Sequence, residues 1–162
     1  MIKIVSNASP LIFLAKIGKL DLLETFEIII PKQVYSEIKE GEKSGREDSH
    51  KIESLIKNNK IKVEEIEIIA ELEEQNLGEG EKAAISLAID KKIELILLDE
   101  RKARRVAKFY KLNPRGAIGV LTDAFRKNKI SKKEFKELIQ KLIKEGYRIS
   151  EELIMDLLKD IK

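Results

Sequence analysis

Two acidic residues stand at positions where a carboxylate could do chemistry. Asp99 directly follows the apolar run IELILL, which predicts a buried strand, and comes just before a predicted helix. Glu81 lies three residues before Ala84 on the apolar stripe of the predicted helix EKAAISLAIDKK, so it faces the body of the protein. Each has a structural alternative. Asp99 could cap the following helix, and Glu81 could interact with the helix dipole in the first turn.

Three further polar residues are suggested by their place in the pattern. Glu37 lies at the edge of the inward face of the predicted helix PKQVYSEIKEG, where a half-exposed surface glutamate is the alternative. Asn7 and Ser9 follow the first predicted strand, IKIVS, where Asn7 could simply be a turn residue. Ser9 stands before Pro10, and this pair predicts a helix that begins with Ser9 as its N-cap.

The composition restricts the chemistry that these residues could perform. The chain has no cysteine, so disulfides, thiolate zinc sites and cysteine nucleophiles are excluded. Its one histidine, His50, lies in a polar stretch. Oxygen ligands without histidine or cysteine suit a hard cation such as Mg²⁺ or Mn²⁺. A cation also relieves the repulsion between neighbouring carboxylates, and it can activate water and neutralise a phosphodiester.

Charge is distributed unevenly along a chain whose net charge is only +3. Residues 64–100 are strongly acidic, and residues 101–148 are strongly basic. The acidic segment could capture a metal ion and the basic segment could attract phosphates, although each could also be the solvated face of helices. The arginines nearest to Asp99 are candidate phosphate ligands: Arg101, Arg104 and Arg105.

Short apolar strands alternate with helices along the whole chain. Strands are predicted at residues 2–6, 27–30, 61–68 and 93–98. Helices are predicted at residues 11–17, 20–26, 31–41, 51–58, 81–92, 101–111, 116–128, 131–146 and 150–162. Residues 42–50 are expected to be polar and mobile, and residues 69–77 fit either helix or loop. The alternation predicts an α/β fold with three layers, α/β/α, and a central, mostly parallel sheet. Ligands bind such sheets at the carboxyl ends of the strands, where Asn7, Ser9 and Asp99 fall.

Length and composition favour one folded domain. The 162 residues fit a single domain, to which the helices of about residues 131–162 are an appendage. With 43% hydrophobic and 38% charged residues, the chain resembles neither a disordered nor a membrane protein. It has no long apolar run and no signal-peptide pattern, so we expect a soluble, cytoplasmic protein that does not contact a membrane. Its abundant lysine and glutamate are typical of heat-adapted proteins.

Five segments, in order and with matching spacing, resemble the PIN-domain family, the fold of VapC-type toxin ribonucleases. They are IVSNASPLIFLAKIG, PKQVYSEI, LGEGEKAAISLAID, LILLDERKARRVA and GAIGVL, and they extend over roughly residues 1–125. The tail GYRISEEL is similar to the end of one largely uncharacterised PIN-like subgroup. The resemblance implies a doubly wound α/β/α fold, an acidic site for Mg²⁺ or Mn²⁺, and endonucleolytic cleavage of single-stranded RNA.

The resemblance also implies roles for individual residues. The first acidic position of the family falls on Asn7, with Ser9 as its polar neighbour, the second on Glu37, the third on Glu81 and the fourth on Asp99. By this correspondence, Glu37, Glu81 and Asp99 hold the ion. Asn7 orients the attacking water or the scissile phosphate, with Ser9 as a substrate contact beside it. The three arginines named above are expected to contact the substrate because of their charge and their nearness to Asp99.

Asn7 departs from the family pattern, in which this residue is an aspartate. Loss of one charge at about 4 Å removes an attraction on the order of 4 kcal/mol at an effective dielectric constant of about 20, so metal affinity should be weaker. The leading interpretation is the ribonuclease toxin of a toxin–antitoxin pair, with a small antitoxin as partner and a homodimer as the assembly. The alternatives are an RNA-binding or regulatory module that has lost catalysis and a nuclease of RNA maturation.

Overall fold

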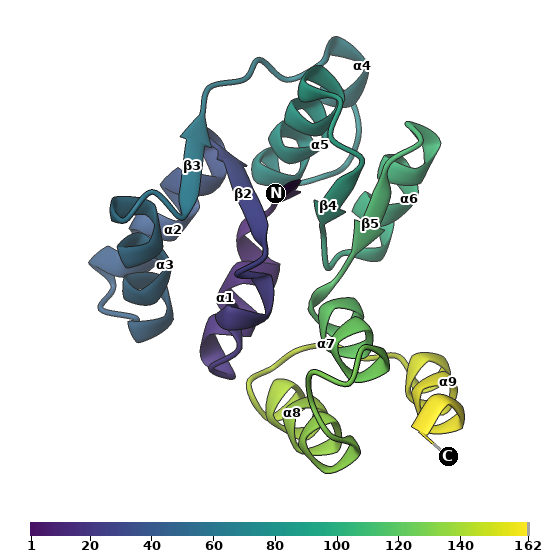
Figure 1. Ribbon diagram of the computed structural model, residues 1–162. Coiled ribbons are helices and arrows are strands. Elements are labelled where there is room, and N and C mark those ends of the chain that lie inside the picture. Colours follow the sequence, from purple (N-terminus) through teal and green to yellow (C-terminus); the bar gives the residue numbers. More distant parts are fainter. Residues whose placement is uncertain (162) are drawn as a thin grey trace.

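The computed structural model describes residues 1–161, except for the side chains of residues 152, 158, 160 and 161. Lys162, the last residue of the predicted final helix, lies outside the described residues. Five strands form one sheet, and every neighbouring pair is parallel (Figure 1). The strands are β1 (Ile2–Ser6), β2 (Phe26–Pro31), β3 (Ile61–Glu64), β4 (Leu95–Leu97) and β5 (Asn113–Arg115).

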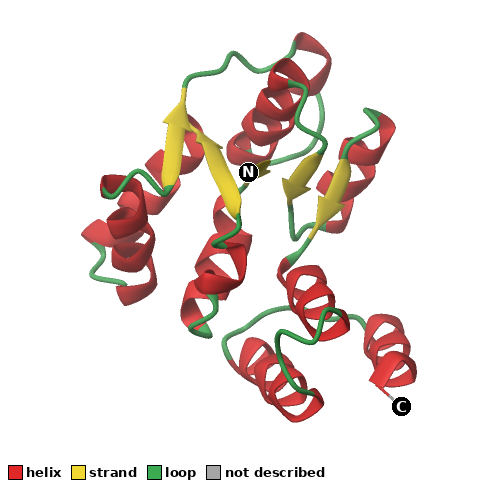
Figure 2. Ribbon diagram, viewed as in Figure 1, coloured by secondary structure: helices red, strands yellow, loops and turns green. Residues whose placement is uncertain are grey.

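Helices cover both faces of this sheet (Figure 2). One buried apolar cluster joins the sheet to α1 (Ala8–Lys16), α2 (Lys32–Lys43), α3 (Glu47–Lys57), α7 (Ala117–Arg126) and α8 (Lys132–Lys144). A second cluster joins the other face to α4 (Ala70–Glu73), α5 (Glu79–Lys91) and α6 (Arg101–Phe109). The chain also contains the 3-10 helix η1 (Leu20–Leu23) and the last helix α9 (Glu151–Ile161). The predicted three-layer α/β/α fold is therefore confirmed.

The strand order fixes where a ligand site should lie. The order is β3-β2-β1-β4-β5, so the chain builds outward from β1 to β3 and then crosses to the other side of β1. The direction of winding changes between β1 and β4, and open α/β sheets bind ligands at the carboxyl ends of the strands at such a point. Asn7 follows β1 there, and its backbone N–H donates to the Leu97 carbonyl of β4 at 3.0 Å.

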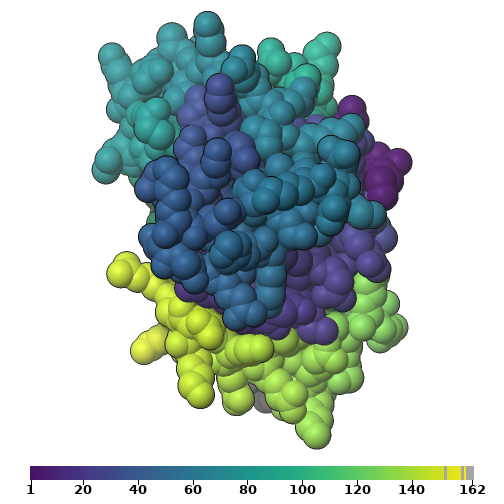
Figure 3. Space-filling view, turned by 90° about the vertical axis from the view of Figure 1, so that its left-hand side faces the viewer, coloured from purple at the N-terminus to yellow at the C-terminus, as the bar shows by residue number. Residues whose placement is uncertain are grey.

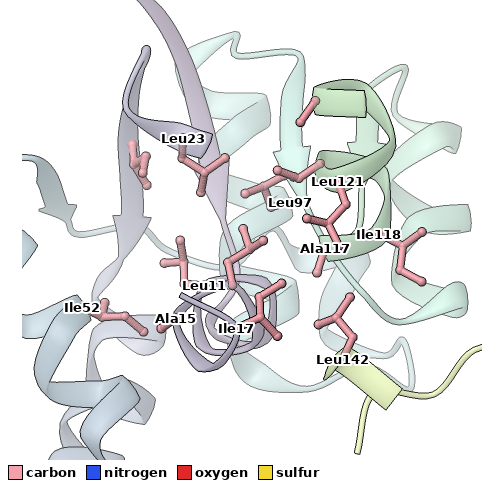
Figure 4. Packing of buried hydrophobic residues seen from close by; sticks show 14 of the residues in the cluster. Leu11, Ala15, Ile17, Leu23, Ile52, Leu97, Ala117, Ile118, Leu121 and Leu142 are labelled. Carbon is pink, nitrogen blue, oxygen red and sulfur yellow. The ribbon is translucent and has the colours of Figure 1, made fainter. Parts of the chain in front are cut away.

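The C-terminal helices pack against the body of the domain. Phe135 and Leu142 of α8 are fully buried in the same cluster as Leu11 of α1. Figure 4 shows Leu142 close to Ala117 of α7, and Figure 3 shows the C-terminal helices along the lower edge of one face, next to α1. None of the described helices has the length and apolar character needed to cross a membrane.

Several predicted boundaries were wrong for physical reasons. Strand β5 was missed because it has three residues with Pro114 in the middle, which is tolerated only at the edge of a sheet. Helix α2 continues past Gly41 to Lys43, and α3 begins at Glu47, inside the segment predicted to be mobile. A Cβ at Gly41 would collide with the side chains of Arg46 and Ser49, so this glycine permits close packing instead of ending the helix.

The first helix also begins earlier than predicted. Asn7 is its N-cap residue, although its side chain makes no capping bond. Ser9 is therefore inside the first helical turn and not the N-cap that the sequence predicted. Pro10 is tolerated there because the first-turn N–H groups have no partner within the helix. The Ser9 hydroxyl is thus available for a contact with another element.

Candidate active site

Asn7, Glu37 and Glu81, here called the acid cluster, gather around the start of α5. A Cβ built on Gly80 would overlap Glu37 Oε1 and lie 2.9 Å from Asn7 Oδ1. These two oxygens come from α2 and from the end of β1, so Gly80 is the position at which three distant segments meet. Because glycine has no side chain, the backbone of α5 can approach both oxygens closely.

The acid cluster contains oxygen atoms that lack hydrogen-bond donors. Glu81 Oε1 accepts the Gly78 backbone N–H at 2.9 Å, which caps α5, so the structural role considered for Glu81 is present. Glu81 Oε2 and Asn7 Oδ1 are buried and have no hydrogen-bond partner. Buried acceptors are usually satisfied, so two unsatisfied oxygens in one cluster have free capacity for a positively charged or donating ligand.

The two carboxylates of the acid cluster are electrostatically disfavoured. Partial burial raises the pKa of Glu37, although the residue as a whole is exposed. The negative charge of Glu81 raises that pKa further. Burial also raises the pKa of Glu81, with a further contribution from Glu100. Backbone N–H groups of Gly80 and Gly78 oppose these shifts. A cation in the acid cluster would remove the charge repulsion.

Asp99 belongs to a separate arrangement, here called the Asp99 network, in which both oxygens of its carboxylate have hydrogen-bond donors. The Ser9 hydroxyl donates to Asp99 Oδ2 at 2.7 Å. The Tyr147 hydroxyl and the Ala117 backbone N–H donate to Asp99 Oδ1 at 2.7 and 2.8 Å. The network thus ties the end of β4 to α1, to the start of α7 and to the segment after α8.

Two further features support the Asp99 network. Burial raises the pKa of Tyr147 far above its usual range, and the Asp99 charge adds to this, so the phenol stays protonated and donates. The Tyr147 ring also packs edge-on against Phe13, with centroids 5.0 Å apart. A Cβ at Gly116 would lie 3.0 Å from both Asp99 Oδ1 and the Tyr147 hydroxyl, so glycine leaves room for their contact.

The donor set of the acid cluster fits a hard divalent cation, because two carboxylates and an amide oxygen converge and two of their oxygens lack partners. Among the side chains that the structure describes, no three of Asp, Glu, His or Cys lie close enough together to hold a metal ion. Glu37 and Glu81 therefore meet with Asn7 and not with a third acid. A role for Asp99 as a metal ligand stays a prediction, and Asp99 Oδ2, which accepts only the Ser9 hydroxyl among the described donors, is its less occupied oxygen.

The predicted phosphate-binding arginines lie on α6, directly after Asp99. Arg101 and Arg105 are exposed. Arg104 is half-buried, and its guanidinium donates to the backbone carbonyls of Asp99 and Leu98. Arg104 therefore also stabilises the turn from β4 into α6.

Sequence reasoning missed three contributors to these two groups. Gly80 lies in the segment LGEGEK, where its glycine could have indicated a close approach of the backbone. Glu100 directly follows Asp99 in the sequence, and its charge acts on Glu81. No local signal in the sequence connects Tyr147 with Asp99, because 48 positions separate the two residues.

Comparison with known proteins agrees with this geometry. A family model described as a PIN domain matches residues 3–162. A solved PilT N-terminus domain protein from the hyperthermophilic archaeon Sulfolobus solfataricus is 19% identical with a TM-score of 0.58, over 76% of this chain and 94% of that one. A domain of a functionally unknown protein from Methanocaldococcus jannaschii is 22% identical with a TM-score of 0.47, over 72% of this chain and 91% of that one. No curated protein matches.

The fold and the strand-end site thus define a PIN-like α/β/α protein. The chain belongs to the PIN-domain family, because the family model extends over nearly its entire length. The resemblance seen in the sequence is confirmed, and the Sulfolobus structure independently supports the fold. PIN domains are typically nucleases and generally use divalent metal ions.

Proposed function

We propose that this protein is a metal-dependent endoribonuclease that cleaves single-stranded RNA. The observation that carries the proposal is the pair of buried, unsatisfied oxygens, Asn7 Oδ1 and Glu81 Oε2, beside the Glu37 carboxylate. A purely structural role leaves these acceptors without explanation, because burial of an unpaired acceptor costs about 1–3 kcal/mol. The family membership makes nuclease chemistry the first expectation for such a site.

Glu37, Glu81 and Asn7 would hold Mg²⁺ or Mn²⁺ at the carboxyl end of the sheet. When bound, the ion supplies positive charge that favours ionisation of water and neutralises the phosphodiester. Asn7 would orient the attacking water or the scissile phosphate through its amide. Glu37 is the more exposed residue of the pair, so its side of the site would be open to the attacking water.

The Asp99 network would position this site. Ser9 lies two residues after Asn7, so the bond from Ser9 to Asp99 fixes the start of α1 relative to β4. The exposed Arg101 and Arg105 would attract the phosphates of RNA and, together with Arg104, neutralise charge next to the site. Asp99 then acts mainly through the elements it joins.

The biological role that we propose is the toxin of a toxin–antitoxin pair in the cytoplasm, acting as a homodimer. A ribonuclease without inhibition would damage its own cell, so this role requires a small antitoxin protein. A basic side chain of that partner could enter the acid cluster and occupy the place of the cation. Co-purification of a small protein that suppresses cleavage would support this role, whereas an uninhibited enzyme would favour RNA maturation.

One second function has a specific observation in its favour. Asn7 brings no charge where the family pattern has an aspartate, and the described residues contain no three-carboxylate group. Both features fit an RNA-binding module that has lost catalysis. If that function is correct, single-stranded RNA binds and survives in the presence of Mn²⁺, and Asn7→Asp creates cleavage.

The test is a cleavage assay with purified protein, single-stranded RNA and Mn²⁺, with a chelator as the negative control. We expect cleavage that the chelator stops and that Glu81→Gln lowers by at least about 100-fold. The matched control is Glu79→Gln, because Glu79 is an exposed glutamate in the same helical turn. Cleavage that survives the chelator, or an equal loss in both variants, would contradict the proposal.

A further inference from the structure

A cavity whose lining includes Asp99 but no residue of the acid cluster lies next to the Asp99 network. It has a volume of about 340 Å³ and is bounded by β5, α6, α7 and the C-terminal segment with α9. This volume falls within the range of ordinary ligand pockets. The cavity is named the basic cavity here, and its charged lining is Asp99, Arg104, Lys108, Arg115, Asp123, Arg126, Arg148 and Asp156.

Cations exceed anions in the basic cavity, since five lining side chains are cationic and three are anionic. Two of the anions are already engaged. Asp99 receives its three donors, and Asp123 lies 3.4 Å from the Arg115 guanidinium. Among the described residues, neither Lys108 nor Arg148 forms an ion pair or a side-chain hydrogen bond. These two side chains are exposed and come from α6 and from the segment after Tyr147.

The basic cavity also has an apolar wall formed by Ile118, Leu153 and Leu157. A ligand that suits it therefore combines negative charge with an apolar or flat portion. A nucleotide unit of a single strand has both, since its phosphate is an anion and its base and ribose can pack on apolar side chains. The cavity adjoins the Asp99 network, because Asp99, Gly116 and Tyr147 belong to its lining. That network is linked to the acid cluster through Ser9, which donates to Asp99 and lies two residues after Asn7.

We propose that the basic cavity binds a backbone phosphate of single-stranded RNA, with Lys108 and Arg148 as the principal contacts. The inference rests on the proposed function, because it extends the path of the substrate from the acid cluster past Asp99. It assigns a role to the C-terminal segment, which supplies Arg148 and the leucine wall. It also gives RNA binding a determinant that does not require the metal ion.

The test measures the binding of a fluorescently labelled single-stranded RNA by anisotropy, in EDTA so that no metal-dependent cleavage occurs. We expect Lys108→Ala and Arg148→Ala each to weaken binding by about three- to tenfold at low salt. Each should also reduce the slope of log affinity against log salt concentration by about 0.7, the value for one lost contact to a single strand. An unlabelled duplex should compete less well than the unlabelled single strand.

The matched control is Lys57→Ala, which removes one exposed lysine at the end of α3, on the opposite side of the domain (Figure 1). It should leave both affinity and salt slope unchanged. The proposal is overturned if wild-type protein does not bind the strand, if Lys57→Ala weakens binding as much as the cavity variants, or if the duplex competes equally well.

A parallel cleavage assay with Mn²⁺ separates this inference from the proposed function. If wild-type protein cleaves RNA but both cavity variants bind and cleave like wild type, the proposed role of the basic cavity in RNA binding is wrong and the nuclease proposal stands. If the cavity variants lose binding while wild-type protein never cleaves, the basic cavity stands and the catalytic proposal fails.

Discussion

The acid cluster and the Asp99 network lie at the same edge of the sheet, yet their carboxylates are in opposite bonding states. In the acid cluster, Glu81 Oε2 and Asn7 Oδ1 are buried without donors. In the Asp99 network, Asp99 accepts from Ser9, from Tyr147 and from a backbone N–H. A buried oxygen without a donor has capacity for a cation, whereas a carboxylate with donors on both oxygens stabilises the elements that supply them.

The difference arises from what surrounds each carboxylate and not from its local sequence. Asp99 and Glu81 both lie next to the first turn of a helix, and each could have been a simple capping residue. Donors from α1, α7 and the segment after α8 converge on Asp99. Glu81 instead acts by its charge on Glu37, which lies with Asn7 at Gly80, the residue before Glu81. Long-range packing therefore places the four predicted site residues in two groups, Asp99 in one and Asn7, Glu37 and Glu81 in the other.

The largest expected effect comes from filling the acid cluster. Gly80→Ala places a methyl group where it overlaps Glu37 Oε1 and crowds Asn7 Oδ1, so the oxygens can no longer converge on one ion. We expect RNA cleavage to fall at least about 100-fold, equivalent to about 3 kcal/mol in the activation barrier. Thermal unfolding should change little, because alanine is the better helix former. Full cleavage by this variant would contradict the assignment of the acid cluster.

A smaller effect, on stability, is expected when Asp99 loses its charge. Asp99→Asn replaces one acceptor oxygen with an NH₂ group that faces donors, so the free energy of unfolding should fall by about 2 kcal/mol. Chemical denaturation without metal measures this change, and Asp90→Asn, at an exposed aspartate in α5, is the control. An Asp99→Asn variant as stable as wild type would show that the network does not hold the fold.

Removal of a single donor should have a still smaller effect. Tyr147→Phe deletes the hydroxyl that donates to Asp99 but keeps the ring against Phe13, so we expect a loss of about 1.5 kcal/mol of stability. Tyr110→Phe is the matched control, because the Tyr110 hydroxyl donates to Glu71 at an exposed site. Equal losses in the two variants would argue against a special role for Tyr147.

The smallest expected effect is a pH-dependent gain in stability when the charge of Glu81 is removed from the acid cluster. The pKa of Glu81 is raised in the folded state, so the folded protein binds more protons, and the free energy of unfolding falls as pH rises above the unfolded pKa. In chelator, Glu81→Gln should therefore be more stable than wild type at neutral pH, by less than about 1 kcal/mol. The difference in stability between Glu81→Gln and wild type should vanish below about pH 4, where the Glu81 carboxyl becomes protonated and is uncharged like the glutamine. A gain that is independent of pH would refute the electrostatic explanation.

The layers of the fold and part of the site could be predicted from the sequence. The alternation of apolar strands and helices predicted the parallel sheet, and Asp99 and Glu81 were identified by their place after a strand and on an apolar stripe. Glu37 gained its importance only from the family resemblance, because its helix position fits a surface residue equally well. In the folded chain, the Glu37 carboxylate lies directly against Gly80 at the start of α5, a contact that the sequence alone does not reveal.

The remaining features depend on contacts that no local pattern encodes. Ser9 was predicted to cap its own helix, but α1 begins earlier and its hydroxyl is used by Asp99. Tyr147 follows a helix that appeared to be an appendage, and it donates to a carboxylate at the centre of the domain. Such bonds depend on how α7 and α8 pack against α1, which sequence periodicity does not specify.

The central claim is that the acid cluster, and not the Asp99 network, binds the divalent ion. Calorimetric titration of Mn²⁺ into metal-free protein without RNA tests it most directly, with Glu81→Gln and Tyr147→Phe beside wild type. We predict a binding signal that Glu81→Gln abolishes and Tyr147→Phe retains. Undiminished Mn²⁺ binding by Glu81→Gln would contradict the claim.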